Sequence, residues 1–127
     1  MLLNSLYYIW LQVMTARYVN KILEDKEAPV KSYSVHPGIV DTDLFEKSNF
    51  RKFPWVKKMF FKSPEKGAIS VLHACFNQDV LSKGGLYISN CKEGISNRFS
   101  KNEVYQEKLF KLSCNLIGIE TQKFGRN

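Results

Sequence analysis

Side chains with catalytic potential are few in this sequence and are not grouped. Asp41 and Asp43 flank Thr42 and could act as paired acids, but an i, i+2 spacing in a loop is more typical of turn or helix-capping chemistry. His36 and His73 belong to no recognisable nucleophile–base arrangement, which favours structural roles for both. We therefore predict no catalytic side chain among these residues.

Metal and disulfide chemistry are not indicated either. The chain has three cysteines, an odd number with no C-x-x-C pair, so neither a disulfide framework nor a zinc site is predicted. We expect Cys75, Cys91 and Cys114 to fill core space. Free thiols and the absence of an N-x-S/T acceptor favour the cytoplasm or the cytosolic face of an intracellular membrane.

Two nucleotide-related motifs are absent from these residues. Dinucleotide-binding folds need glycines in the first strand-to-helix turn, where the backbone approaches the pyrophosphate. The first glycine here is Gly38, and the seven glycines form neither G-x-x-x-G-x-G nor G-x-G-x-x-G. No tyrosine has a lysine four residues later, so a Y-x-x-x-K pair is absent as well.

The pattern predicts five ordered elements that would position any site. Ser63, Pro64 and Glu65 supply an N-cap, a first-turn proline and a first-turn acid, a strong helix start. A loop runs from Asp41 to Phe50, and a short helix could follow Pro54. The expected elements are a helix over 6–25, a strand over 30–36, a helix over 64–76, a strand over 86–89 followed by a polar turn over 90–94, and a helix capped by Asn102 and ending at Gly118.

Hydrophobic spacing suggests which helix faces are buried. We expect two apolar stripes to pack into the core: Ala68, Val71, Leu72, Cys75 and Phe76, and Tyr105, Leu109, Leu112 and Leu116. Two short strands joined by a helix make a parallel pair, and parallel strands are normally covered on both faces within a larger sheet. The sequence thus predicts one partial domain over 1–127, part of a doubly wound α/β fold.

Composition and charge narrow the class of protein. The chain has 127 residues, a net charge of +7 and 44% hydrophobic residues, which excludes disordered and collagen-like classes. Six basic residues and one acid lie between Arg51 and Lys66, interleaved with aromatic residues. This segment fits a solvated face or a membrane surface, and no nucleic-acid module accompanies it. The uncharged start, 1–16, is shorter than a membrane span and is expected to form a buried helix.

One motif carries a resemblance. Residues 35–44 read V-H-P-G-I-V-D-T-D-L, and a strand ending in H-P-G-x-V-x-T resembles the segment after the sixth strand of short-chain dehydrogenases/reductases. The resemblance implies that main-chain groups of Val40 bind the nicotinamide carboxamide of NAD(P). It also implies that Pro37 and Gly38 set the turn and that the Thr42 hydroxyl bonds the cofactor.

The resemblance extends from about residue 11 to residue 120. The segments around Trp55 and Lys66, together with G-G-L-Y at 84–87, are similar to retinol-dehydrogenase-like members. The resemblance implies that this chain forms the C-terminal portion of a Rossmann-type doubly wound sheet and that residues 1–10 diverge from the family. It further implies that the region 45–62, including a loop from Asn49 to Phe61, covers a lipophilic alcohol or carbonyl substrate.

The chain departs from the family where the chemistry would occur. Family spacing puts Ser5 at the catalytic tyrosine and Ile9 at the catalytic lysine, and neither can replace them. We therefore expect no activity, and no firm cofactor binding, from the isolated chain. The alternative is a non-enzymatic fragment that docks on membranes, or on a full-length homologue, through its basic-aromatic segment and open sheet edge.

Overall fold

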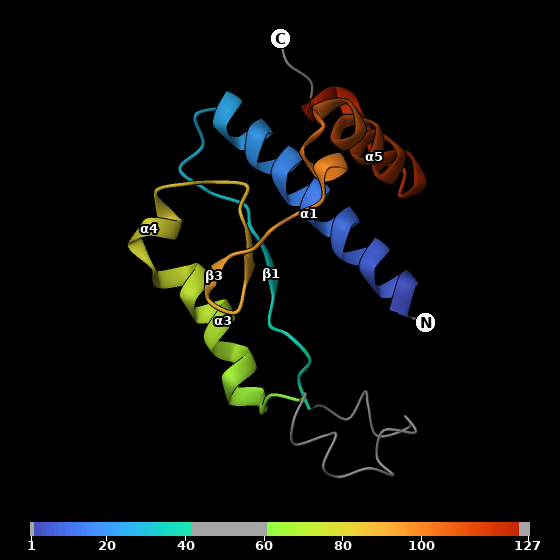
Figure 1. The fold of residues 1–127 in the computed structure, drawn as a ribbon. Helices are drawn as coiled ribbons and strands as arrows, with labels where there is room; N and C mark the ends of the chain where they lie inside the picture. The colour runs from blue at the N-terminus through green and yellow to red at the C-terminus, as the bar shows by residue number, and fades with distance from the viewer. Residues whose placement is uncertain (1, 42–60, 125–127) are drawn as a thin grey trace.

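The computed structural model describes residues 2–41 and 61–124 (Figure 1). The predicted helix after Pro54 lies outside these residues. The elements in chain order are α1 (Leu2–Asp25), β1 (Ser34–His36), α3 (Pro64–Phe76), α4 (Gln78–Leu81), β2 (Tyr87–Ser89), β3 (Lys92–Glu93), the 3-10 helix η3 (Arg98–Lys101), α5 (Glu103–Leu116) and the 3-10 helix η4 (Thr121–Phe124).

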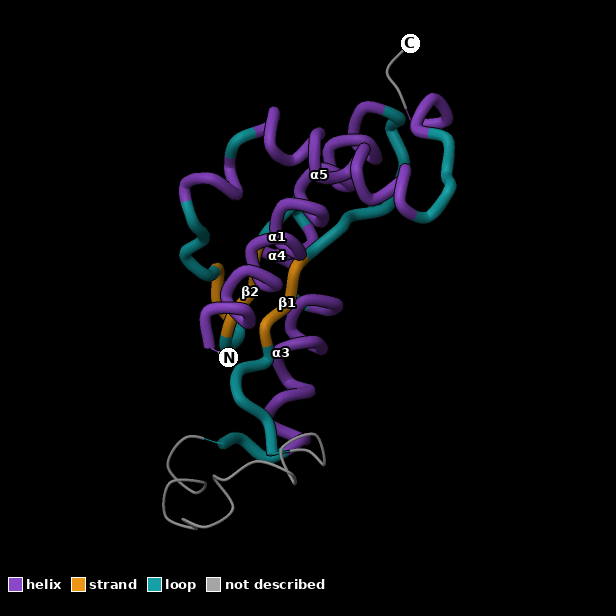
Figure 2. Tube along the Cα trace, turned by 90° about the vertical axis from the view of Figure 1, so that its right-hand side faces the viewer, coloured by secondary structure: helices purple, strands orange, loops and turns teal. Residues whose placement is uncertain are grey.

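The strands form a small mixed sheet in the order β1-β2-β3. β1 and β2 are parallel, with Val35 opposite Ile88, and β2 and β3 are antiparallel. In both ribbon views the strands lie between α1 and α3 (Figures 1 and 2). The predicted parallel pair with a helical connection is therefore confirmed, and the chain has a mixed α/β fold.

Two strand predictions need correction. The first strand covers 34–36 rather than 30–36, because the Ser32 amide donates to Asn20 Oδ1 of α1 (3.2 Å) instead of continuing a ladder. The polar turn after β2 also contains a return strand, β3. Asn90 and Cys91 both have positive φ (54° and 58°), as a tight two-residue hairpin requires, and such a short polar strand leaves little pattern in the sequence.

The apolar core joins the sheet to α3 and α4. Ala74, Val80 and Ile88 are buried together, and Tyr33, Val35 and Leu86 pack against them. The Tyr33 hydroxyl donates to the Val80 carbonyl (3.1 Å), so this half-buried ring packs on the core with its polar end paired. Tyr33 and Val35 are two residues apart and share this face of the chain, as in an extended strand.

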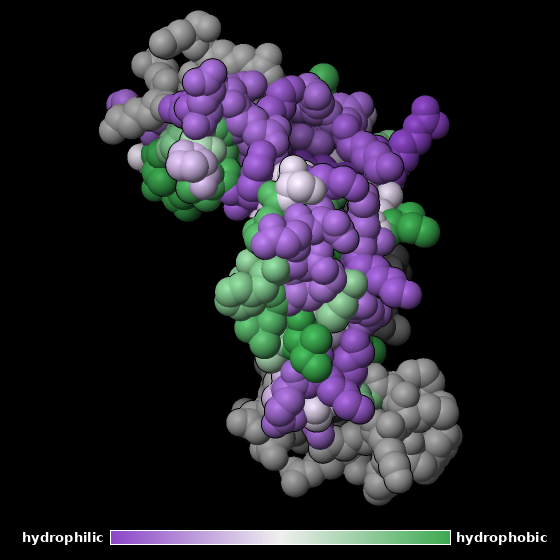
Figure 3. Space-filling model, turned by 90° about the vertical axis from the view of Figure 1, so that its left-hand side faces the viewer, coloured by the Kyte–Doolittle hydropathy of each residue, from purple (hydrophilic) through white to green (hydrophobic). Residues whose placement is uncertain are grey.

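Both predicted helix stripes are wrong about which face is buried. α3 buries only Gly67, Ser70 and Ala74, whose small side chains let the helix approach the sheet closely. Its larger apolar residues point outward: Leu72 is 53% exposed and Phe76 is 73% exposed. Figure 3 shows hydrophobic surface along the α3 side of the molecule.

In α5 the predicted stripe is wrong for Tyr105, Leu112 and Leu116, which are exposed, whereas Leu109 is half-buried. The buried residues of α5 are Gln106 and Cys114, whereas Leu116 of the predicted stripe is 79% exposed. The Phe110 ring packs on Tyr18 of α1, with ring centroids 5.1 Å apart. Cys114 fills core space as expected, but Cys75 is exposed and Cys91 only half-buried, so the prediction fails for Cys75.

A polar cluster fixes η3 and α5 to α1. Arg17 of α1 donates from Nη1 to Ser100 Oγ (3.0 Å) and from Nε to the Gly85 carbonyl (3.3 Å). The Gln106 amide donates to the Ser100 carbonyl (2.8 Å). Burial lowers the pKa of the Arg17 guanidinium, and the nearby Glu93 carboxylate opposes this shift. Fully satisfied buried polar groups of this kind specify one arrangement of the helices.

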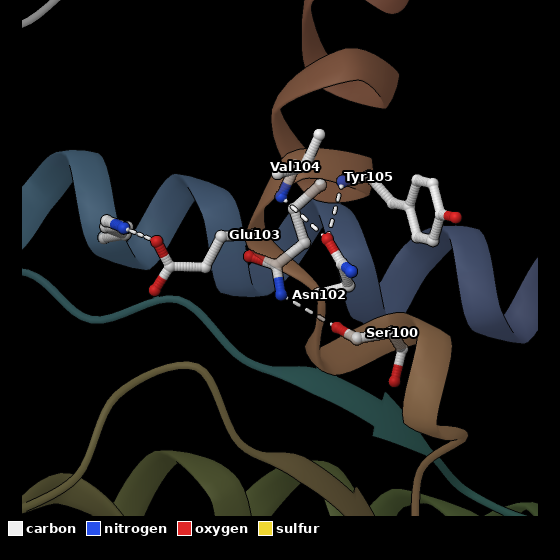
Figure 4. Close-up of polar contacts among 7 residues, drawn as sticks. Ser100, Asn102, Glu103, Val104 and Tyr105 are labelled. Atoms are coloured by element: carbon white, nitrogen blue, oxygen red, sulfur yellow. Dashed lines mark hydrogen bonds and ion pairs between the residues drawn. The ribbon is translucent and has the colours of Figure 1, made fainter.

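The start of α5 supports this cluster. Asn102 Oδ1 accepts from the amides of Val104 (3.0 Å) and Tyr105 (3.3 Å), and Glu103 pairs with Lys21 of α1 (Figure 4). The predicted cap is confirmed, and it sits beside an ion pair that joins the same two helices.

Substitution of Gly84 tests the contact between α1 and the loop before β2. A Cβ at position 84 would occupy the place of the buried Asn20 amide, which also accepts the Ser32 amide. We expect Gly84→Ala to lower the free energy of unfolding by about 3 kcal/mol, from overpacking and a strained hydrogen bond. The shift in the urea midpoint measures it. Lys83→Ala, at the adjacent exposed residue, should leave the midpoint unchanged; equal midpoints for Gly84→Ala and the wild type would contradict the packing.

Candidate functional site

The chain turns sharply at the carboxyl end of β1. Gly38 has φ +90°, a conformation that residues with a side chain rarely adopt. A Cβ at this position would also lie 3.3 Å from both Cε and Nζ of Lys62. Gly38 is therefore needed for its backbone conformation, and a side chain there would also press on the flexible end of Lys62.

Beyond the turn, the backbone pairs with residue 62. Val40 and Lys62 form a parallel bridge, in which the Lys62 amide donates to the Ile39 carbonyl (2.8 Å) and the Asp41 amide donates to the Lys62 carbonyl (2.8 Å). In a parallel bridge of this kind the flanking residues make the hydrogen bonds, so the N–H and C=O of Val40 point away from Lys62. One donor and one acceptor thus face outward together.

The side chain of Val40 packs on the first turn of α3. A Cβ at Gly67 would lie 2.7 Å from Cγ2 of Val40, which is too close for two carbon atoms that are not bonded to each other. The helix start is fixed as predicted: Ser63 Oγ accepts the Lys66 amide (3.4 Å), and a hydrogen bond from Ser63 lowers the pKa of Glu65. Helix α3 therefore provides the surface on which Val40 rests.

The structure brings three of the four predicted cofactor residues together. Pro37, Gly38 and Val40 lie on one turn after β1. Thr42 and the segment 45–60 lie outside the described residues, so the hydroxyl contact and the substrate loop stay predictions. Ile9 is in α1 and half-buried.

Other site chemistry is limited in the part of the chain that the structure describes. No group of three or more His, Cys, Asp or Glu residues within 2–41 and 61–124 could hold a metal ion. None of the helices described there is long and apolar enough to cross a membrane.

Sequence reasoning did not identify the supports of this turn. The role of Lys62 depends on contacts with segments 25 and 28 residues away. Gly67 is the one support that the sequence could have indicated, because an isolated glycine within a helix often has a packing reason, here the close contact with Val40.

Known proteins align with about three-quarters of this chain at about 30% identity. No family model matches the chain. It is 32% identical to human retinol dehydrogenase 11 over 95 residues, 74% of this chain and 30% of that protein. It is 34% identical to mouse retinol dehydrogenase 12 over 92 residues, which are 72% of this chain and 29% of that protein. It is 29% identical to human polyprenol dehydrogenase over 111 residues, which are 84% of this chain and 33% of that protein.

The chain is similar to retinol and polyprenol dehydrogenases of the short-chain dehydrogenase/reductase family over about three-quarters of its length. The predicted retinol-dehydrogenase-like resemblance is confirmed by these relatives. The chain spans about 30% of the length of the curated relatives it matches. A mixed α/β arrangement with a parallel strand pair is compatible with the Rossmann-like fold of the family.

Substitution of Gly67 tests the support beneath Val40. Gly67→Ala adds a methyl group against Cγ2 of Val40, and overpacking should cost about 1–3 kcal/mol, of which helix propensity returns about 1 kcal/mol. We expect a modest loss of stability in urea unfolding and a shift of the Val40 and Asp41 amide resonances. Ala68→Gly, at the adjacent exposed position of α3, should cost about 1 kcal/mol without moving those resonances. Unmoved Val40 and Asp41 resonances in Gly67→Ala would exclude the contact.

Proposed function

We propose that this chain forms the nicotinamide-side part of an NAD(P)-dependent oxidoreductase that acts on a lipophilic alcohol or carbonyl. The observation that supports it is the outward pair of main-chain groups on Val40, because a carboxamide needs one donor and one acceptor close together. The similarity to dehydrogenases of the short-chain dehydrogenase/reductase family supports the cofactor class. The names of the relatives, retinol and polyprenol dehydrogenase, support a lipophilic substrate.

Each residue of the turn has a defined part in this proposal. The Val40 amide would donate to the carboxamide oxygen and its carbonyl would accept from the carboxamide nitrogen. Pro37 and Gly38 would hold the turn, and the Thr42 hydroxyl would give a further hydrogen bond to the cofactor. The bound nicotinamide would supply or accept the hydride. These residues fit one end of a dinucleotide and contain no glycine-rich turn for its pyrophosphate.

Proton transfer needs a group that these residues do not provide. The family tyrosine donates a proton to the nascent alkoxide, and a lysine lowers its pKa; Ser5 and Ile9 stand at those positions here. A serine hydroxyl is too weak an acid, and isoleucine carries no charge. The 127 residues alone are therefore proposed to be inactive, with any activity depending on groups from elsewhere.

A chimera tests the proposed function. Residues of this chain would replace the matching 95-residue segment of human retinol dehydrogenase 11, and oxidation of retinol would be followed with NAD and with NADP. We expect the chimera to retain activity, and Thr42→Val in it to raise the KM for the cofactor about tenfold, the effect of losing one hydrogen bond of about 1.4 kcal/mol. The isolated chain, titrated with NADPH and NADH, should show no saturable binding. A folded but inactive chimera would contradict the proposal.

A second candidate function is pairing with a homologous chain. The Ser34 amide donates to the Leu86 carbonyl of the segment leading into β2 (3.0 Å), so the main-chain groups of Val35 face the other edge of β1. No strand among the described elements pairs with that edge. An open edge beside exposed apolar helix faces favours a non-enzymatic fragment that docks on a full-length homologue.

Membrane contact belongs to the same second candidate. It is supported by the basic and aromatic composition of 51–66, and the proposed location is the cytoplasm or the cytosolic face of an intracellular membrane. Flotation with liposomes containing anionic lipid should recover the chain at low salt and release it at high salt. Failure to float at low salt would exclude membrane docking, and co-purification with a full-length homologue tests the pairing separately.

A further inference from the structure

One lysine side chain links three segments around the candidate turn. Lys62 Nζ donates to the Pro37 carbonyl (3.4 Å) and to Asn90 Oδ1, and its end lies against Gly38. Asn90 is the first residue of the left-handed turn between β2 and β3. The ammonium therefore joins the turn after β1, the segment before α3 and the β2–β3 hairpin.

The backbone and the side chain of Lys62 make different contacts and have different roles. The two main-chain hydrogen bonds to Ile39 and Asp41 define the bridge and do not depend on the side chain. The ammonium instead holds the Pro37 carbonyl, two peptide units before Ile39, and ties it to the hairpin. The ammonium contacts the Pro37 carbonyl at 3.4 Å and also Asn90 of the hairpin, so the two contacts together can restrain a turn that contains a flexible glycine.

We propose that Lys62 is a positioning residue that fixes the orientation of the Val40 main-chain groups. Its relevance to cofactor binding rests on the proposed function, but its effect on the turn does not. With Pro37 held at one end and the bridge at the other, the outward N–H and C=O of Val40 keep one direction. Without the ammonium, the described residues still hold the turn through the bridge and through the pairing of β1 with β2 before it.

Amide hydrogen exchange in the whole chain, followed by NMR, tests this positioning. Lys62→Met keeps the aliphatic stem and the backbone but removes the donor, and Lys62→Arg restores a donor. Lys66→Met removes a positive charge from an exposed position four residues away and is the matched control. We expect exchange at Asp41 and at position 62 to rise about tenfold in Lys62→Met, the equivalent of about 1.4 kcal/mol. Exchange in Lys66→Met should be unchanged, and Lys62→Arg should recover most of the protection.

The reference amide is Gln106, which is bonded to the Asn102 carbonyl in α5 (3.1 Å). Unchanged exchange at Asp41 in Lys62→Met would overturn the proposal. Equal acceleration at Gln106 would overturn it too, because the lysine would then act on global stability. Failure of Lys62→Arg to recover protection would exclude the ammonium contact as the cause.

The chimera separates this inference from the proposed function. In an active chimera, Lys62→Met should raise the KM for the cofactor with little change in kcat, and Lys62→Arg should reverse this change. An unchanged KM together with faster exchange would overturn the role in cofactor positioning. An inactive chimera would count against the proposed function, whereas the exchange result would still decide whether Lys62 fixes the turn.

Discussion

The candidate site depends on one short stretch of main-chain pairing, the parallel bridge between Val40 and Lys62. It brings the chain after β1 to the start of α3. Its two hydrogen bonds engage the Ile39 carbonyl and the Asp41 amide, and they leave the N–H and C=O of Val40 facing outward. Two glycines support this bridge: Gly38 adopts the positive φ of the turn, and Gly67 leaves room for the Val40 side chain. The direction of the Val40 groups thus follows from backbone geometry and from the absence of two side chains.

In the rest of the described structure, close approach and polar satisfaction act together with the apolar core and the aromatic contact between α1 and α5. Helix α3 buries Gly67, Ser70 and Ala74, and α5 contacts α1 through the Phe110–Tyr18 ring pair and the Glu103–Lys21 ion pair. The Arg17 cluster joins η3 and the loop before β2 to α1. Large apolar residues remain on the outer helix faces, and this distribution agrees with a chain that corresponds to about 30% of its relatives' length.

Local signals in the sequence predicted local structure well. The Ser63 cap and the Asn102 cap both start helices where expected, because capping chemistry depends only on neighbouring residues. The buried faces could not be predicted in this way. Periodicity selects the more apolar face of a helix, and in α3 that face carries Leu72 and Phe76, whereas contact with the sheet selects small residues.

The same distinction applies to the candidate site. The turn at Pro37 and Gly38 was found because its residues are consecutive and resemble a known motif. The contributions of Lys62 and Gly67 were missed, because each depends on a contact between segments more than 20 residues apart. β3 was missed for a different reason, since two charged residues show no alternation.

The long sequence separations of these contacts also bear on how the chain reaches its structure. Arg17 and Ser100 are 83 residues apart in the sequence. The parallel strands β1 and β2 are likewise separated in the chain by the whole of α3. Helices can form early from local interactions, but each distant pairing first costs loop-closure entropy, which grows with the length of the loop. The small sheet should therefore assemble late in folding, on helices that are already formed, and its pairing should limit the folding rate.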